Sequence, residues 1–296
     1  MKKAILEYKI TKTDAGKSAE DICKKRLGIS AKLLTTLKLS GKLTINDNIC
    51  RSIDKVQEND IFKADVTDYG TSEKIVKSYC PIEILYDDEY MTIVNKPRKM
   101  SIHPSIGHFE DTLANAVVGF WERNNETHKF HAVNRLDKDT SGICIIAKNT
   151  FAHNHLSVQS KNGELTKKYL AVVDGTPHSE SGTIDAPIKR TGFSAIKRMV
   201  ADDGKNAITH YRTIKTSSSY SLCEIWLETG RTHQIRVHFA YMGNPLMGDW
   251  LYNEKHIKGT NDGQLLHVHQ ISLTHPATHK KMEFTAPLPM DMQTLF

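Results

Sequence analysis

The sequence predicts an α+β protein in two parts, a small module over residues 1–75 and a larger unit over 81–296. Capped helical patterns and a short hairpin pattern fill the first part. Between 65 and 80 the apolar pattern dissolves, which predicts a linker, placed at 76–80. From 81 onward, short alternating or apolar runs typical of strands are interspersed with helical periods. A chain of 296 residues is long enough for one sizeable core with a small companion.

The composition is that of an ordinary soluble protein, with 39% hydrophobic and 25% charged residues. A net charge of +6 fits a polyanionic partner, although many proteins without one are as basic. The five cysteines are irregularly spaced and resemble neither a disulfide framework nor a zinc ribbon. We find no signal peptide and no run of 18 apolar residues, so we expect no membrane partner and a cytoplasmic protein.

The first module reads as two helices followed by a hairpin. Residues 18–27 have helical spacing and end at Gly28, and Ser30 caps a second helix that ends near Gly41. Residues 43–49 then outline a hairpin with its turn at Asp47 and Asn48. This arrangement loosely resembles the S4 RNA-binding domain.

Basic residues gather on this module, seven against the single acid Asp47 between positions 24 and 51. By resemblance to S4 domains, Lys32, Lys38 and Arg51 are candidate contacts for RNA phosphates, which would supply affinity and salt dependence but little sequence choice. A solvated basic face on a structural cap gives the same pattern.

The second unit begins at Pro81 with a predicted strand pair, 82–85 and 90–95, followed by Lys96-Pro97 and then His103-Pro104. Further strands are predicted at 143–147, 167–175, 220–228, 264–273 and near 281, and a helix at 149–159. We expect Asp111 to cap a helix through Trp121, and Thr232 to cap one through Met242. The basic stretch 182–212 is predicted to be a loop that either lines an RNA groove or is simply exposed.

The sequence Asn134-Arg-Leu-Asp-Lys-Asp-Thr-Ser-Gly142 precedes the buried strand at 143–147. Two carboxylates, Asp137 and Asp139, therefore lie in a loop that enters a rigid strand, where catalytic side chains concentrate. A plain surface turn also uses Asp, Thr, Ser and Gly, and from composition alone it is the more common case.

Arg-Leu-Asp-x-x-Thr-Ser-Gly, the Lys-x-Tyr strand and Gly230-Arg-x-His-Gln-Ile-Arg236 occur in this order, and together they resemble the motifs of RluA-type pseudouridine synthases. The resemblance spans about residues 81–290 and implies that Asp137 is catalytic, that Tyr169 stacks on the base, and that Arg231 pairs with Asp137. Asp139 becomes a turn residue. Further candidates for substrate or RNA contact are Arg135, Ile235, Lys96 and His103.

The resemblance implies a central mixed, mainly antiparallel sheet with the cleft along one face. It also implies isomerisation of uridine to pseudouridine in ribosomal or transfer RNA, by a monomer without metal or organic cofactor. Two positions depart from the family. Lys99 stands where a Gly is common, so the loop either differs or is strained, and Asn134 replaces a frequent His.

Three other functions fit parts of the sequence. The pairs His153-x-His155 and His267-x-His269 invite a metal site, but their spacing is not that of a zinc motif. Asp137 and Asp139 could serve as the paired acids of a glycoside hydrolase, although two residues on one loop would need distinct environments. A noncatalytic RNA-binding protein that keeps the fold is the remaining alternative.

Overall fold

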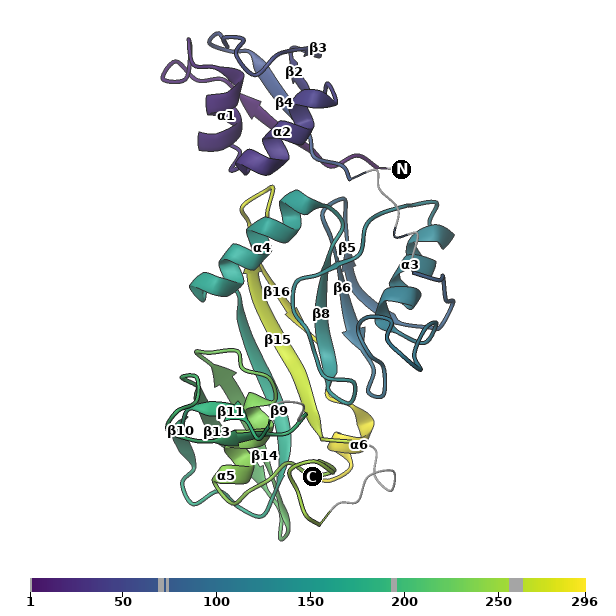
Figure 1. The fold of residues 1–296 in the computed structure, drawn as a ribbon, viewed down its shortest axis with the longest axis vertical. Helices are drawn as coiled ribbons and strands as arrows, with labels where there is room; N and C mark the ends of the chain where they lie inside the picture. The colour runs from purple at the N-terminus through teal and green to yellow at the C-terminus, as the bar shows by residue number, and fades with distance from the viewer. Residues whose placement is uncertain (1, 69–71, 73–74, 193–195, 256–262) are drawn as a thin grey trace.

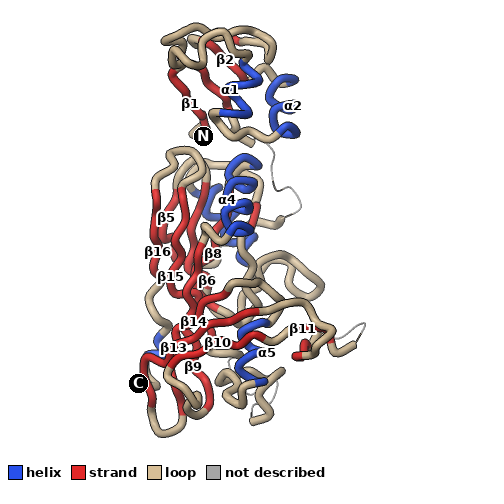
Figure 2. The backbone as a smooth tube through the Cα atoms, turned by 90° about the vertical axis from the view of Figure 1, so that its left-hand side faces the viewer, coloured by secondary structure: helices blue, strands red, loops and turns tan. Residues whose placement is uncertain are grey.

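A computed structural model describes residues 2–68, 72, 75–192, 196–255 and 263–296. A small N-terminal unit lies at one end of the molecule, above α4 (Thr150–Asn162), and a large sheet with flanking helices forms the rest (Figure 1). The side view in Figure 2 shows the same separation, with long strands running through the lower unit. The structure therefore confirms the α+β class with a central mixed sheet.

The N-terminal unit packs two helices on a four-stranded sheet of order β1-β4-β2-β3. Ser18 and Ser30 cap the two helices through their side chains, the second as predicted, and the hairpin is present. The sequence reading missed β1, which pairs antiparallel with β4. The elements are β1 (Ile5–Lys9), α1 (Ala19–Lys25), α2 (Ala31–Leu39), β2 (Leu43–Ile45), β3 (Asn48–Ile49) and β4 (Ile61–Asp65).

The N-terminal unit rests on the start of α4 and on a neighbouring strand end. The Tyr90 hydroxyl donates to the Ile5 carbonyl at 2.9 Å, and Nε2 of His155 lies 3.1 Å from the Gly28 carbonyl. Phe151 is buried in the same hydrophobic cluster as the core of the N-terminal unit. Apolar side chains of the two units therefore pack together, and the burial of this surface stabilises the contact between the units.

The large sheet has ten strands, eight of them in the order β10-β13-β14-β9-β15-β8-β6-β5, with β16 on β15 and β7 on β8. All its pairings are antiparallel except that of β15 with β8. The strands are β5 (Glu83–Asp87), β6 (Met91–Lys96), β7 (His131–Ala132), β8 (Ser141–Ala147), β9 (Thr166–Asp174), β10 (Ser181–Asp185), β13 (Ile208–Thr216), β14 (Tyr220–Leu227), β15 (Leu266–Thr274) and β16 (Lys281–Thr285). The other helices are α3 (Leu113–Arg123), α5 (Gln234–Tyr241) and α6 (Met290–Gln293).

The linker predicted at 76–80 lies within the described residues and is docked on α3. Asn115 donates to the Val76 carbonyl at 2.6 Å and accepts at its own carbonyl from the Ser78 amide at 3.1 Å. A side chain at Gly119 would collide with the Ser78 carbonyl, so the glycine allows the segment to pack closely on the helix. The predicted cap of α3 was wrong, because Thr112 and Asn115 form the capping box.

The basic stretch 182–212 is more regular than the predicted loop. It contains β10, the start of β13 and a separate hairpin formed by β11 (Ile188–Arg190) and β12 (Arg198–Val200). Strands β10 and β13 extend the large sheet at one edge. Short strands of three residues carry too little periodicity to be read from sequence, which explains the difference.

The parallel pairing of β8 with β15 depends on Gly142. Its φ of +106° is a conformation that side chains disfavour, and an added Cβ would lie 2.3 Å from the Val268 carbonyl oxygen. The glycine therefore allows β15 to approach the start of β8, directly after the Asp137 loop. This approach fixes the loop against the sheet.

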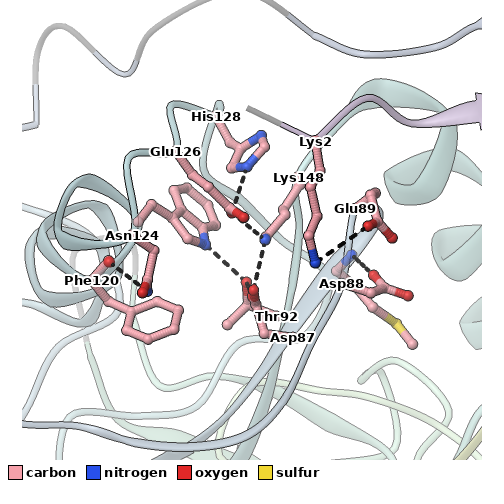
Figure 3. Close-up of polar contacts among 12 residues, drawn as sticks. Lys2, Asp87, Asp88, Glu89, Thr92, Phe120, Asn124, Glu126, His128 and Lys148 are labelled. Carbon is pink, nitrogen blue, oxygen red and sulfur yellow. Dashed lines mark hydrogen bonds and ion pairs between the residues drawn. The ribbon is translucent and has the colours of Figure 1, made fainter.

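A buried ion-pair cluster secures the opposite end of β8 (Figure 3). The Lys148 ammonium is almost fully buried and lies 2.9 Å from Asp87 and 2.7 Å from Glu126. Burial alone would raise the pKa of Glu126, but hydrogen bonds from Lys148 and His128 hold it below its usual value. The cluster thus ties β8 to β5 and to the segment after α3.

None of the described helices is long and apolar enough to cross a membrane.

Candidate active site

Asp137 lies in the turn that enters β8, as the sequence predicts. Its carbonyl accepts the Thr140 amide at 3.1 Å, which closes the turn. The side chain is 36% exposed and lines a cavity of about 500 Å³. The neighbouring Asp139 is in the same turn but is not among the residues that line this cavity. The two carboxylates are therefore not equivalent.

Arg236 is the cation that holds Asp137. Its Nη1 donates to Oδ2 of Asp137 at 3.0 Å, while Nε and Nη2 donate to the two oxygens of Asp249 at 2.7 Å each. Burial alone would lower the pKa of Arg236, but Asp249 and Asp137 hold it above its ordinary value. The bidentate contact with the buried Asp249 fixes the plane of the guanidinium and so aims Nη1 at Asp137.

The expected pairing of Arg231 with Asp137 is corrected by this geometry. Arg231 precedes α5, is exposed, and donates from Nε to the Asn206 carbonyl at 2.8 Å. Arg236 instead lies inside the helix between buried residues, on the face turned toward the Asp137 loop. A buried Arg needs an anionic partner, and the position of Arg236 among apolar helix residues is the hint in the sequence that points to it, although only the structure shows which carboxylates it binds. Arg231 remains on the wall of the cavity.

The start of α5 also differs from the prediction that Thr232 caps it. His233 occupies the cap position in a left-handed conformation, with φ of +60°, and its side chain makes no capping bond. Gln234 instead accepts the Arg231 amide at 2.9 Å. The imidazole of His233 is turned toward Asp137, with Nε2 at 3.6 Å from Oδ2. Burial lowers the pKa of His233, although Asp137 opposes the shift.

Tyr169 lies on β9 and lines the same cavity as Asp137, so its ring can contact a base that is bound there. Burial, with a smaller effect of nearby anions, raises the pKa of its phenol, so the hydroxyl stays protonated at neutral pH. Ile235 contributes an apolar part of the wall, and Lys167 lines it as well. Lys167 was not singled out from the sequence.

Lys96 cannot contact RNA in this arrangement, which corrects its assignment as a substrate contact. Its side chain is fully buried, and the ammonium donates to the carbonyls of Pro97, Met100 and Lys138 at 2.8–3.1 Å. Burial lowers its pKa to about 8. Lys96 thus joins the loop after β6 to the Asp137 loop. Lys99, in the first of these loops, keeps the left-handed conformation of a Gly, with φ of +62°.

Asn134 has a structural role that explains how it replaces His. Its amide donates to the Ile143 carbonyl at 2.9 Å and accepts the Ile145 amide at 2.8 Å. The residue is buried, so this pair of bonds fixes the chain before Asp137 to strand β8. The altered residue therefore preserves the position of the loop.

Arg135 and His103 are both exposed near the cavity. Arg135 lines the cavity. The His103 ring packs edge-on against Phe130 with centroids 5.2 Å apart. Both side chains are accessible to RNA, and their contacts with RNA stay predictions.

The basic residues of the N-terminal unit differ in their partners. Lys38 pairs with Glu20 at 2.6 Å and Arg51 pairs with Asp54 at 3.0 Å. Both acids lie outside residues 24–51, the range in which the basic residues gather. Lys32 is exposed and lines a cleft between the two units, together with Lys42 and Lys129. Lys32 is therefore the best placed of the three to contact a phosphate.

The histidine pairs that suggested a metal site have other contacts. Nδ1 of His267 lies 2.9 Å from the Ser141 hydroxyl, and Nδ1 of His269 lies 2.8 Å from the Ala286 carbonyl. Burial lowers the pKa of His267 to about 4, so its ring is neutral. No group of three or more potential metal ligands occurs among the described residues.

Comparison with known proteins identifies the family. The family model described as RNA pseudouridylate synthase matches residues 90–241, a range that includes the Asp137 loop, Tyr169 and the start of α5. The chain belongs to the RNA pseudouridylate synthase family. Its relatives include the uncharacterized RNA pseudouridine synthase YjbO of Bacillus subtilis, 40% identical over 91% of this chain and 95% of the relative.

Relatives with an assigned name place this pseudouridylate synthase in the RluA type. The ribosomal large subunit pseudouridine synthase D of Zymomonas mobilis is 38% identical over 73% of this chain and 72% of its own. The protein of the same name from Pseudomonas aeruginosa is 34% identical over 85% and 82%. The human RNA pseudouridylate synthase domain containing 1 shares the fold, with a TM-score of 0.59 at 24% identity, over 71% of this chain and 84% of that chain.

Proposed function

We propose that this RNA pseudouridine synthase isomerises uridines of large-subunit ribosomal RNA, with Asp137 as the nucleophile. The observation that carries the assignment is the Asp137 carboxylate, held by Arg236 at 3.0 Å at the wall of a cavity of about 500 Å³. Two relatives named as ribosomal large subunit pseudouridine synthases support this class of RNA. Transfer RNA is the other substrate to test.

The proposed reaction balances without a cofactor. Asp137 attacks C1′ of the flipped uridine, so that an ester bond forms as the bond between C1′ and base N1 breaks, and the uracil anion turns within the cavity. C5 then attacks C1′ and the ester bond breaks, which releases the Asp137 carboxylate. The C5 proton leaves and N1 takes up a proton, so the product is an isomer. Flipping the base costs a few kcal/mol, which stacking on Tyr169 offsets in part.

Arg236 would keep the Asp137 carboxylate oriented for attack, since the bidentate contact with Asp249 fixes the guanidinium. Arg231, on the cavity wall, and Arg135 are proposed to contact the substrate or the RNA chain. In the N-terminal unit, which we propose to be S4-like, Lys32 would contact a phosphate and supply salt-dependent affinity.

The test compares Asp137→Asn with Asp139→Asn as a matched control in the same turn. Pseudouridines are mapped in ribosomal and transfer RNA from cells that lack the gene and carry each variant. We expect at least one site to disappear without the gene, return with Asp139→Asn, and stay absent with Asp137→Asn. Sites that lie in transfer RNA would correct the substrate class. Full restoration by Asp137→Asn would contradict the role of Asp137 and favour a different nucleophile.

A further inference from the structure

Tyr252 lies behind the site, outside the motifs that identified it. Its hydroxyl accepts the backbone N–H of Arg198 at 2.9 Å, and it lies 2.8 Å from Nδ1 of His233. The guanidinium carbon of Arg236 lies 5.0 Å from the centre of its ring, and the Lys197 ammonium 5.9 Å. One side chain thus contacts both residues that face Asp137 and the first residue of β12.

The contacts of Tyr252 and Asp137 favour one tautomer of His233. A phenol has one hydrogen, and because its oxygen accepts from Arg198, that hydrogen is available for Nδ1 of His233. Nδ1 is then an acceptor, so a neutral imidazole carries its proton on Nε2. The charge of Asp137 selects the same tautomer, because the other would turn the Nε2 lone pair toward the carboxylate 3.6 Å away.

The backbone at His233 shows that this placement is built into the fold. The residue has φ of +60°, a conformation that is uncommon for residues other than Gly, although His adopts it more often than most. A residue at a helix cap ordinarily uses its side chain to accept a helix amide, whereas this imidazole is directed between Tyr252 and Asp137. Local strain of this kind persists where surrounding contacts hold it.

We propose that Tyr252 is a positioning residue that fixes His233 as the Nε2–H tautomer and so ties the β11–β12 hairpin to the Asp137 carboxylate. The hairpin carries Lys189, Arg190, Lys197 and Arg198, charges suited to an RNA chain. RNA seated on the hairpin therefore holds the Arg198 N–H on Tyr252, which holds the imidazole on Asp137. The inference rests on the proposed role of Asp137.

The first test reads the tautomer without any activity. Nitrogen NMR of the full chain, with His233 assigned by its loss in His233→Asn, should show a protonated Nε2 and an acceptor Nδ1. In Tyr252→Phe the share of the Nε2–H tautomer should fall, because Nδ1 loses its donor and only Asp137 still favours that tautomer; an unchanged share would contradict the role of Tyr252. A protonated Nδ1 in the unsubstituted protein would overturn the inference. This result is independent of whether the proposed reaction occurs.

The second test measures single-turnover pseudouridine formation. Tyr252→Phe should lower the rate at saturating RNA about three- to tenfold, the value of one hydrogen bond, with the RNA concentration for half-maximal rate unchanged. Tyr86→Phe is the control, since it removes a hydroxyl bound to Asp88 at 2.9 Å, outside the site, and should keep the rate. Equal rates in Tyr252→Phe and the unsubstituted enzyme, or an equal fall in both variants, would overturn the inference.

A double variant separates positioning from general damage. His233→Asn keeps a residue that tolerates the left-handed conformation while removing Nε2. If Tyr252 acts through His233, adding Tyr252→Phe to His233→Asn should cost nothing further. Additive losses would contradict the link. An unsubstituted enzyme that forms no pseudouridine would instead count against the proposed function, with the NMR result still standing for the tautomer.

Discussion

Nη1 of Arg236 lies 3.0 Å from Oδ2 of Asp137, and the two residues are 99 positions apart in the chain. The guanidinium reaches this point because Asp249, fully buried, holds its other two donors. The same Asp249 carboxylate accepts the amides of Leu251 and Tyr252, which fixes it in turn. The carboxylate proposed to react is thus oriented by a second carboxylate that does not line the cavity.

Arg236→Lys should lower pseudouridine formation on the order of 100-fold. Lysine keeps the charge but lacks the planar fork, so it cannot bind Asp249 by two donors and Asp137 by a third. Loss of an aligned charged donor has effects of this size in enzymes. Arg231→Lys tests the other pairing: the Arg231 side chain donates through Nε to the Asn206 carbonyl and not to Asp137, and we expect a loss below about tenfold. A larger loss at Arg231 would restore the pairing expected from the sequence.

Gly142→Ala should destabilise the protein by about 2–5 kcal/mol. Alanine would adopt a disfavoured φ, at about 1–2 kcal/mol, and its Cβ would collide with the Val268 backbone. Gly163→Ala separates the two causes, since it also has positive φ but meets no atom within 4 Å. It should cost only about 1–2 kcal/mol in urea unfolding. Equal costs would show that strands β8 and β15 can separate to admit the methyl group.

Lys96 should give a distinctive pH dependence of stability. Burial lowers its pKa from 10.5 to about 8, so between these pH values the unfolded chain binds more protons than the folded one. The free energy of unfolding therefore gains from this residue as pH rises from about 8 to 10.5, by at most about 1.4 kcal/mol per pH unit. We expect the difference between the unsubstituted protein and Lys96→Met to rise over this window. A flat difference would show that Lys96 titrates normally.

Lys32→Ala should weaken RNA binding and reduce the slope of log affinity against log salt by about one. Lys32 is exposed at the cleft between the units, where a phosphate can reach it. Lys25→Ala is the control, because Lys25 already pairs with Asp21 at 2.8 Å. If both variants keep the slope of the unsubstituted protein, the N-terminal unit does not bind RNA through Lys32.

Local patterns predicted most of the elements that carry the site. Ser30 caps its helix, the helix predicted at 149–159 is present as α4, and the apolar run at 143–147 forms a buried strand, because capping and periodicity depend on residues close in sequence. Predictions failed where a neighbouring residue made the contact instead, since Thr112, and not Asp111, caps the start of α3. The short strands of the 182–212 stretch were missed for lack of periodicity.

The sequence by itself determined the family, the carboxylate in the loop before β8, and the strand that carries Tyr169. Only the tertiary structure decided which Arg holds Asp137, that Lys96 faces inward, and that Tyr252 reaches His233. The motifs consist of residues close together in the chain, so the sequence is enough to recognise them and their order. The contacts join segments up to 99 residues apart, and their geometry is set by packing of the whole sheet and α5.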